Sequence, residues 1–321
     1  MRFTLRIILA LLLIQSMIIS SLLLAGCGDK AQHTGTEKPE QVRVISTVFA
    51  SYDFARQVAG AHGDVRMLVP PGSEIHSYEP TPQDILDIGG CDLFIYVGGE
   101  SDAWVEELLA SIDSSGIELI RLLDCVKVEK EDGSVAAESD RRAAKDEIDE
   151  HVWTSVKNAK DISLAIADRL KVIDSVNAKA YEDNAQRYSQ QLDDLDSVFR
   201  DIVKQGQRKT LVFGDRFPFL YFARDYGLDC HAAFPGCSTA NEPSAKTVAS
   251  LIDIVKGERI PVVFFLELSN HSLADVIAEE SGAQALMLHS CHNISLKDYD
   301  DGESYVSLMR KNAENLKVAL S

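Results

Sequence analysis

The sequence predicts an α/β protein in which two parallel-sheet lobes are bridged by one long helix. Three observations predict this fold. Short β-rich runs alternate with amphipathic helical stretches between residues 42 and 172, which is typical of parallel strands covered by helices. An uninterrupted helical stripe of apolar residues follows, from about residue 177 to residue 203. The strand–helix alternation then restarts and continues through residues 207–321.

The N-terminus has the three-part layout of a secretory signal peptide. Arg2 and Arg6 form a short basic region, residues 7–24 are almost wholly apolar, and Ala25 and Gly26 precede Cys27. A small-residue pair before a cysteine is the cleavage pattern of bacterial lipoproteins. Residues 1–26 are therefore predicted to be a signal peptide. The alternative is a transmembrane helix, because the apolar run is nearly long enough to span a bilayer.

Cleavage would leave a mature chain that begins at a lipidated Cys27 and is held to the membrane by acyl chains. Residues 27–41 are polar, contain glycine and proline, and predict a flexible tether. The rest of the protein is then expected at the extracytoplasmic face of the cell membrane. The five cysteines beyond Cys27 could be paired there, and only Cys230 and Cys237 lie close enough in sequence to suggest a pair. Buried thiols are an equally good interpretation for these five residues, which are Cys91, Cys125, Cys230, Cys237 and Cys291.

Composition and charge limit the possible functions. The 321 residues are 45% hydrophobic and 26% charged, a balance typical of globular proteins, and the length suits two domains. The net charge is −18, and the mature chain would carry −20 because the signal peptide contains two arginines and no acid. Such a charge argues against nucleic-acid binding, which needs a basic surface. It is compatible with attraction of cations, although a solvated acidic surface explains most of it.

The first lobe is predicted to occupy residues 42–172. Residues 129–150 interrupt its alternation with dense charge and few large apolar side chains, and they predict a surface loop. A helical pattern resumes at Val152. The expected strands are 42–48, 65–69, 93–97 and 117–122, with a helix at 104–112.

A linking helix is predicted over residues 173–206. Its apolar residues recur in steps of three and four from Ala178 to Ile202, and no glycine or proline interrupts them. At 1.5 Å per residue such a helix extends about 40 Å, enough to pass from one lobe to another. The alternative is one larger domain with a long surface helix. In the second lobe, residues 207–321, strands are expected at 210–213, 262–266 and 285–288, and helices at 245–255, 273–280 and 303–320.

Histidines lie in loops at the ends of the predicted elements, where open α/β sheets bind ligands. His76 is in a proline-rich turn after the second strand, and His151 is at the end of the acidic loop. His289 and His292 directly follow the strand expected at residues 285–288. A single histidine of this kind is usually structural. Their repeated placement makes a shared metal site a reasonable hypothesis, although spacing alone does not show that they converge.

Four segments resemble the zinc- and manganese-binding lipoproteins of bacterial ABC transporters. They are HSYEPTPQDI at 76–85, DEIDEHVWTSVKNA at 146–159, NEPSAKT at 241–247 and the C-terminal SYVSLMRKNAENLKVAL. The resemblance runs from about Val42 to the C-terminus. It implies two lobes joined by a rigid helix, with a metal ion held in the cleft between the lobes by four side chains. His76 and His151 match the first two ligand positions of the family.

The sequence departs from the family pattern at the other two positions. Many relatives carry a histidine after the first strand of the second lobe, but here the nearest donor is Asp215, for which a helix N-cap is an equally good interpretation. The last family ligand is usually an aspartate that follows a Gly-Ala pair and a strand. Counting from Gly282 places that position on His289, with His292 three residues later as its rival. Glu267 is a weaker candidate.

The resemblance implies extracytoplasmic capture of a divalent transition metal and its delivery, by a monomer, to an ABC permease and its ATPase. A site with two or three imidazoles favours Zn²⁺, whose preferred donors are nitrogen and sulfur. Mn²⁺ or iron gains support if Asp215 and Glu267 both bind and His76 and His151 are the only histidine ligands. A metallohydrolase is a less favoured class, because the chain has no H-E-x-x-H string. A surface adhesin, a role sometimes ascribed to the family, is not tested by any feature of the sequence.

Overall fold

The computed structural model describes residues 41–73, 78–131, 148–236 and 243–321. Both sheets belong to one compact unit, Gln41–Ser321. The predicted signal peptide, Cys27 and most of the acidic loop lie outside the described residues. Within the described ranges, no helix is long and apolar enough to cross a membrane.

The first sheet is fully parallel, with strand order β2-β1-β3-β4. Val44 in the centre of β1 pairs with Val65 on one side and with Leu93 on the other. All three positions are apolar because a parallel sheet is covered on both faces. The elements of this lobe are β1 (Val42–Ser46), α2 (Phe49–Ala59), β2 (Gly63–Met67), α3 (Pro82–Gly89), β3 (Leu93–Tyr96), α4 (Ala103–Ser111), β4 (Glu118–Arg121) and α5 (Val156–Ile173).

The second sheet is also parallel, with strand order β6-β5-β7-β8. Its central strand β5 pairs with β6 and β7, and its register shifts between Phe213 and Arg216. The elements that follow α6 along the chain are β5 (Thr210–Phe217), α7 (Leu220–Tyr226), β6 (Asp229–Pro235), α8 (Ala245–Glu258), β7 (Val262–Phe265), α9 (Ser272–Ser281), β8 (Gln284–Met287), α10 (Leu296–Asp300) and α11 (Tyr305–Leu320). Short 3₁₀ turns lie at Gly60–His62, Glu100–Asp102, Leu122–Asp124, Val152–Thr154 and Ser175–Asn177.

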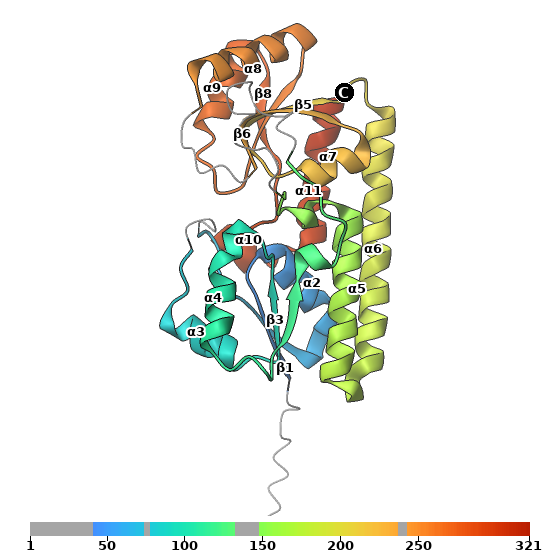
Figure 1. Cartoon of the computed structure of the whole chain (residues 1–321). Helices are drawn as coiled ribbons and strands as arrows, with labels where there is room; N and C mark the ends of the chain where they lie inside the picture. Colours follow the sequence, from blue (N-terminus) through green and yellow to red (C-terminus); the bar gives the residue numbers. More distant parts are fainter. Residues whose placement is uncertain (1–40, 74–77, 132–147, 237–242) are drawn as a thin grey trace, which may run out of the picture. The chain divides into compact units, whose positions relative to one another are not determined.

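Helix α6 (Ala178–Gln205) joins the two sheets (Figure 1). It has 28 residues, which corresponds to about 42 Å. It packs against α2 and α5 of the first lobe and against α7 and α11. Near one end Asn184 donates to the Val58 carbonyl oxygen at 2.8 Å, and near the other Asp196 accepts from the Tyr226 hydroxyl at 2.9 Å. The predicted fold class, two parallel-sheet lobes bridged by one long helix, is confirmed.

One apolar core extends through both lobes. It contains Val44 and Ile95 of the first sheet, Leu192 of α6 and Phe213 of the second sheet. The opposite faces of the two sheets have their own smaller cores, under α3 and α4 in the first lobe and under α8 and α9 in the second. The apolar residues on the α6-facing side of each sheet therefore belong to a single core that both lobes share. This shared core explains why the carboxyl ends of both sheets are held near one another.

The expected strands and the helices expected at 104–112, 245–255, 273–280 and 303–320 are present within a few residues of the predicted bounds. Strand β6 was not anticipated. Its sequence, DCHAAFP, contains a charge, a histidine and a proline, so it lacks the apolar run on which strand prediction depends. Helix α7 was not anticipated either. Five of its seven residues are buried, so it lacks the polar face by which a surface helix is recognised.

A buried carboxyl group, Asp102, closes the turn after β3. Its carboxylate accepts from the backbone N–H of Val97 at 2.6 Å, and more weakly from Gly98 and from the Thr47 hydroxyl at 3.4 Å. Burial raises the pKa of Asp102 to about 6 despite these bonds. The folded-state pKa thus lies above the unfolded value of about 3.9. The free energy of unfolding therefore falls as the pH rises from about 4 to about 6, because the ionised carboxylate is less favourable in the folded state. Below about pH 4 the group is protonated in both states and the loss is absent.

We therefore expect Asp102→Asn to stabilise the protein at neutral pH. The free energy of unfolding should rise by about 2–3 kcal/mol at pH 7.5 and change little at pH 4, because two pKa units correspond to about 2.7 kcal/mol. Urea denaturation at the two pH values measures the difference. Asp113→Asn is the control, since Asp113 is exposed and bonds to Ser115 with a lowered pKa. An equal gain for Asp102→Asn at both pH values would contradict the assignment.

Candidate metal centre

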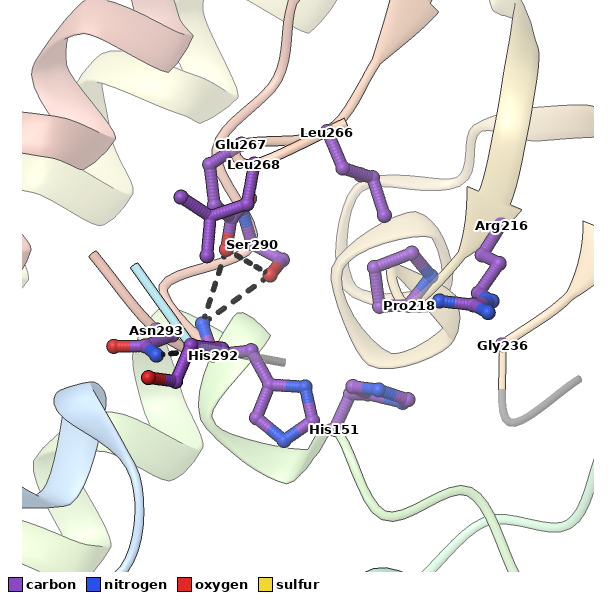
Figure 2. Close-up of a pocket in the computed structure, with 11 residues that line it drawn as sticks. His151, Arg216, Pro218, Gly236, Leu266, Glu267, Leu268, Ser290, His292 and Asn293 are labelled. Atoms are coloured by element: carbon purple, nitrogen blue, oxygen red, sulfur yellow. Dashed lines mark hydrogen bonds between the residues drawn. The ribbon is translucent and has the colours of Figure 1, made fainter. Parts of the chain in front are cut away.

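A pocket lies where loops from the two sheets meet, at the carboxyl ends of β5, β7 and β8 (Figure 2). This is the position at which open α/β sheets bind ligands. Three of the residues singled out from the sequence, His151, Glu267 and His292, line it. The other lining residues are Ser73, Arg216, Pro218, Gly236, Leu266, Leu268, Ser290 and Asn293.

His151 is 1% exposed and is oriented by Asp149. One oxygen of Asp149 accepts both from the His151 backbone N–H at 2.8 Å and from ring Nδ1 at 3.2 Å. A proton on Nδ1 leaves the lone pair on Nε2, which is the arrangement of a metal-binding histidine backed by a carboxylate. Burial lowers the pKa of His151, but the charges of Asp149, Glu150 and Glu131 outweigh it and the pKa is raised.

His292 meets His151 across the pocket. The two ring centroids are 5.2 Å apart with an interplanar angle of 86°, and Figure 2 shows the two imidazoles side by side. The ring of Trp153, which is fully buried, lies 4.9 Å from the ring of His292 and 5.5 Å from that of His151. Both imidazoles therefore pack against the indole. Its Nε1–H donates to the Ser290 carbonyl oxygen at 2.9 Å.

The segment that carries His292 is attached to the first lobe by backbone hydrogen bonds. The first N–H groups of α2 have no partner inside their own helix, and the N-cap residue Val48 supplies no side-chain cap. Phe49 N–H donates instead to the His292 carbonyl oxygen at 2.9 Å, and Ala50 N–H donates to the Cys291 carbonyl oxygen at 3.1 Å. The N-terminus of α2 is thus satisfied by the loop after β8.

The loop after β2 makes a second attachment. Asn293 donates through its side-chain amide to the carbonyl oxygens of Pro70 at 3.0 Å and of Ser73 at 2.7 Å. Gly72 N–H donates to the Ile294 carbonyl oxygen at 2.8 Å. These bonds hold residues 70–73, which precede His76 in the sequence, against the segment that contains His292. His76 itself lies outside the described residues.

His289 has a different environment from His292. It is 4% exposed, and its backbone is held by Asn312, which accepts from His289 N–H and donates to the His289 carbonyl oxygen, both at 2.7 Å. The Cys291 N–H donates to ring Nδ1 at 3.0 Å. A neutral imidazole that accepts at Nδ1 carries its proton on Nε2, and in the described part of the chain this buried Nε2 has no hydrogen-bond partner. In that tautomer Nε2 offers no lone pair to a metal ion.

Asp215 lies inside β5 and does not cap a helix. One of its oxygens accepts from Arg216 N–H at 2.8 Å and the other accepts from Leu266 N–H at 3.1 Å. It joins β5 to the loop after β7 at the point where the register of β5 shifts. The next residue, Arg216, is the one that lines the pocket, since successive side chains of a strand point to opposite faces.

Three residues of this region were not predicted from the sequence: Asp149, Trp153 and Arg216. Asp149 and Trp153 are within two positions of His151, and the usual carboxylate partner of a metal-binding histidine could have suggested Asp149. A guanidinium has no lone pair for a metal ion, so nothing in the sequence marks Arg216 as a residue of a metal site. Within the described ranges, no group of three or more His, Cys, Asp or Glu side chains is arranged to hold a metal. Of the cysteines, Cys91, Cys125, Cys230 and Cys291 are free thiols, and Cys237 lies outside the described residues.

Comparison with known proteins identifies the family. The family described as "Zinc-uptake complex component A periplasmic" matches residues 44–319. The chain belongs to this family. This assigns it to a family of solute-binding proteins, and the expectation that it is not an enzyme is confirmed.

Individual members of the zinc-uptake family agree with this assignment. The chain is 31% identical over 313 residues to the high-affinity zinc uptake system protein ZnuA of Bacillus subtilis, which covers 93% of this chain and 94% of that protein. It is 30% identical to the zinc-binding lipoprotein AdcA of Streptococcus pneumoniae, but spans only 59% of AdcA. The Zn(II)-bound ZnuA-like domain of AdcA superposes with a TM-score of 0.73 at 29% identity, covering 87% of this chain and 99% of that domain.

The bond between Asp149 and His151 gives a testable consequence. We expect Asp149→Asn to weaken metal binding about tenfold or more, because loss of a carboxylate behind a ligating histidine usually costs 10–100-fold in affinity. Isothermal titration with Zn²⁺ measures the change. Asp275→Asn is the matched control, because Asp275 accepts from Nδ1 of the exposed His271 at 2.7 Å and neither residue lines the pocket in the part of the chain that is described. An equal loss in both variants would mean that the effect is not specific to the pocket.

Proposed function

We propose that this protein captures Zn²⁺ outside the cytoplasm and delivers it to an ABC permease and its ATPase for import. The observation that carries the proposal is the pair of imidazoles of His151 and His292 in the pocket, one of them backed by Asp149. Membership of the zinc-uptake family and the names of ZnuA and AdcA support zinc as the cargo and transport as the role.

The spacing of the two imidazoles suits a tetrahedral metal ion. With Zn–N bonds of 2.0–2.1 Å and a tetrahedral angle, two imidazoles on one zinc have ring centroids about 5 Å apart. The observed centroid separation of 5.2 Å is compatible with that distance. A donor set built on imidazoles favours zinc over Mn²⁺, which prefers more oxygen ligands and binds more weakly at mixed sites.

We propose His76, His151 and His292 as ligands. His76 is included on the family resemblance, and the bonds from Asn293 to Pro70 and Ser73 place the beginning of its loop beside His292. The sequence count favoured His289, but its Nδ1 accepts from Cys291 N–H and leaves no lone pair on Nε2. Asp215 is a weak candidate, because in the described part of the chain it does not line the pocket, whereas its neighbour Arg216 does.

Alanine substitutions distinguish the two histidines of the loop after β8. We expect His292→Ala to weaken zinc binding by at least a hundredfold and His289→Ala by less than tenfold, which reverses the order expected from the Gly282 register. His151→Ala should be as damaging as His292→Ala. Titration against zinc chelators measures the affinities, and the fluorescence of Trp153 in a Trp104→Phe background reports binding beside the imidazoles. A larger loss for His289→Ala would make His289 the ligand, and tighter binding of Mn²⁺ than of Zn²⁺ would overturn the choice of metal.

We further propose that Cys27 is lipidated and anchors the mature chain at the extracytoplasmic face of the membrane, where it acts as a monomer. The support is the Leu-Ala-Gly-Cys string that ends at Cys27 and the description of the relative AdcA as a lipoprotein.

Substitution of the cysteine tests the anchor. Cys27→Ser should abolish labelling by a radioactive fatty acid and move the protein out of the lipid-anchored membrane fraction, because the serine hydroxyl is not a substrate for thioether formation. The purified mature chain should bind Zn²⁺ equally with cysteine or with serine at position 27. Cys91→Ser is the control, since Cys91 is a buried thiol of the first lobe and its loss should leave labelling intact. Undiminished lipid labelling of Cys27→Ser would refute the anchor.

A further inference from the structure

The carboxylate of Glu267 is bound to the backbone of the segment that carries His292. Its Oε2 accepts from Ser290 N–H at 2.7 Å, and its Oε1 accepts from the Ser290 hydroxyl at 2.5 Å and from His292 N–H at 3.3 Å. The Glu267 side chain is only 6% exposed. Figure 2 shows these bonds converging on the turn that leads to the His292 imidazole.

The turn adopts a conformation that an unsupported chain would avoid. Cys291, between the two N–H donors, has φ 59°, and Leu268, next to Glu267, has φ 61°. Residues other than glycine rarely take positive φ, and they persist there only where surrounding contacts hold them. Successive N–H groups around such a residue form a concave site for an anion. In this turn, the anion is the carboxylate of Glu267.

We propose that Glu267 is a positioning residue for metal capture and acts by holding the 290–292 turn so that the His292 imidazole faces His151. This inference rests on the proposed function, because it takes His292 to be a metal ligand. Both oxygens of Glu267 already accept charge-assisted hydrogen bonds, which are stronger than those between neutral groups. Oε1 accepts two of these bonds, so coordination of a metal ion through that oxygen would require loss of one of them.

The test is a double-mutant cycle in the full mature chain, with Zn²⁺ as the probe. Glutamine at position 267 keeps the size of the side chain but replaces one acceptor oxygen by an NH₂ group, so either the Ser290 N–H or the His292 N–H loses its acceptor on this side chain. Glu267→Gln should raise the Kd for Zn²⁺ by at least tenfold, as expected for an outer residue that orients a ligand. In a His292→Ala background the same substitution should change the Kd by less than twofold. In a His151→Ala background it should keep its full effect.

Glu303→Gln is the matched control. Glu303 also accepts from a serine hydroxyl, that of Ser307, at 2.5 Å, and in the described chain it does not line the pocket. Its Kd should equal that of the unchanged protein. Ser290→Ala provides a second route, because it leaves the carboxylate unaltered and removes the hydroxyl that donates to Glu267 and also accepts from His292 N–H at 3.2 Å. It should raise the Kd by a smaller factor, and this loss too should vanish in the His292→Ala background.

The outcomes separate the two proposals. If Glu267→Gln weakens binding equally in the His292→Ala background, Glu267 acts independently of His292 and the positioning role is wrong. An unchanged Kd for Glu267→Gln alone also overturns it. If His292→Ala leaves the Kd unchanged, the ligand assignment fails instead. Thermal melts without metal identify variants that do not fold, and for Glu267→Gln the Ser290→Ala cycle then decides the question by the same criteria.

Discussion

The geometry of the candidate metal centre depends on one interaction, the capping of helix α2 by the loop after β8. The N–H groups of Phe49 and Ala50 donate to the carbonyl oxygens of His292 and Cys291. A helix start offers unpaired N–H groups and a positive end of the helix dipole. This helix is capped by a segment from the other sheet, so that folding of the first lobe and placement of His292 are coupled.

Residues that follow strands of both sheets therefore line the same pocket. Helix α6 and the shared apolar core hold the lobes, while Asn293 and Asn312 fix the two ends of the 289–293 segment from opposite sides. Trp153 supports both imidazoles, since its indole packs against the two rings and donates to the Ser290 carbonyl oxygen. Buried, well-packed supports of this kind are what keep ligand geometry constant before a metal arrives.

The fold could be predicted from the sequence because its determinants are local. Apolar runs predicted the strands, and the uninterrupted stripe from Ala178 to Ile202 predicted the linking helix. The site could be predicted only in part. His151 and His292 were identified as candidates from their places at element ends, but the choice between His289 and His292 depends on a hydrogen bond from Cys291 to one ring nitrogen. The periodicity of apolar residues and the spacing of histidines do not predict that hydrogen bond.

The same limit explains the assignment of Asp215. Asp215 is the nearest residue with oxygens that could bind a metal ion. In β5, however, successive side chains point to opposite faces near the register shift, so Arg216 lines the pocket and Asp215 accepts from Leu266 N–H. The pocket therefore combines two imidazoles, a guanidinium and a carboxylate that accepts hydrogen bonds from the backbone. A divalent cation entering it gains most from lone pairs on nitrogen, because the nearby negative charges of Asp149 and Glu267 act through the histidines and their backbone. Charge attracts the ion, and the tautomers of the histidines decide which of them can hold it.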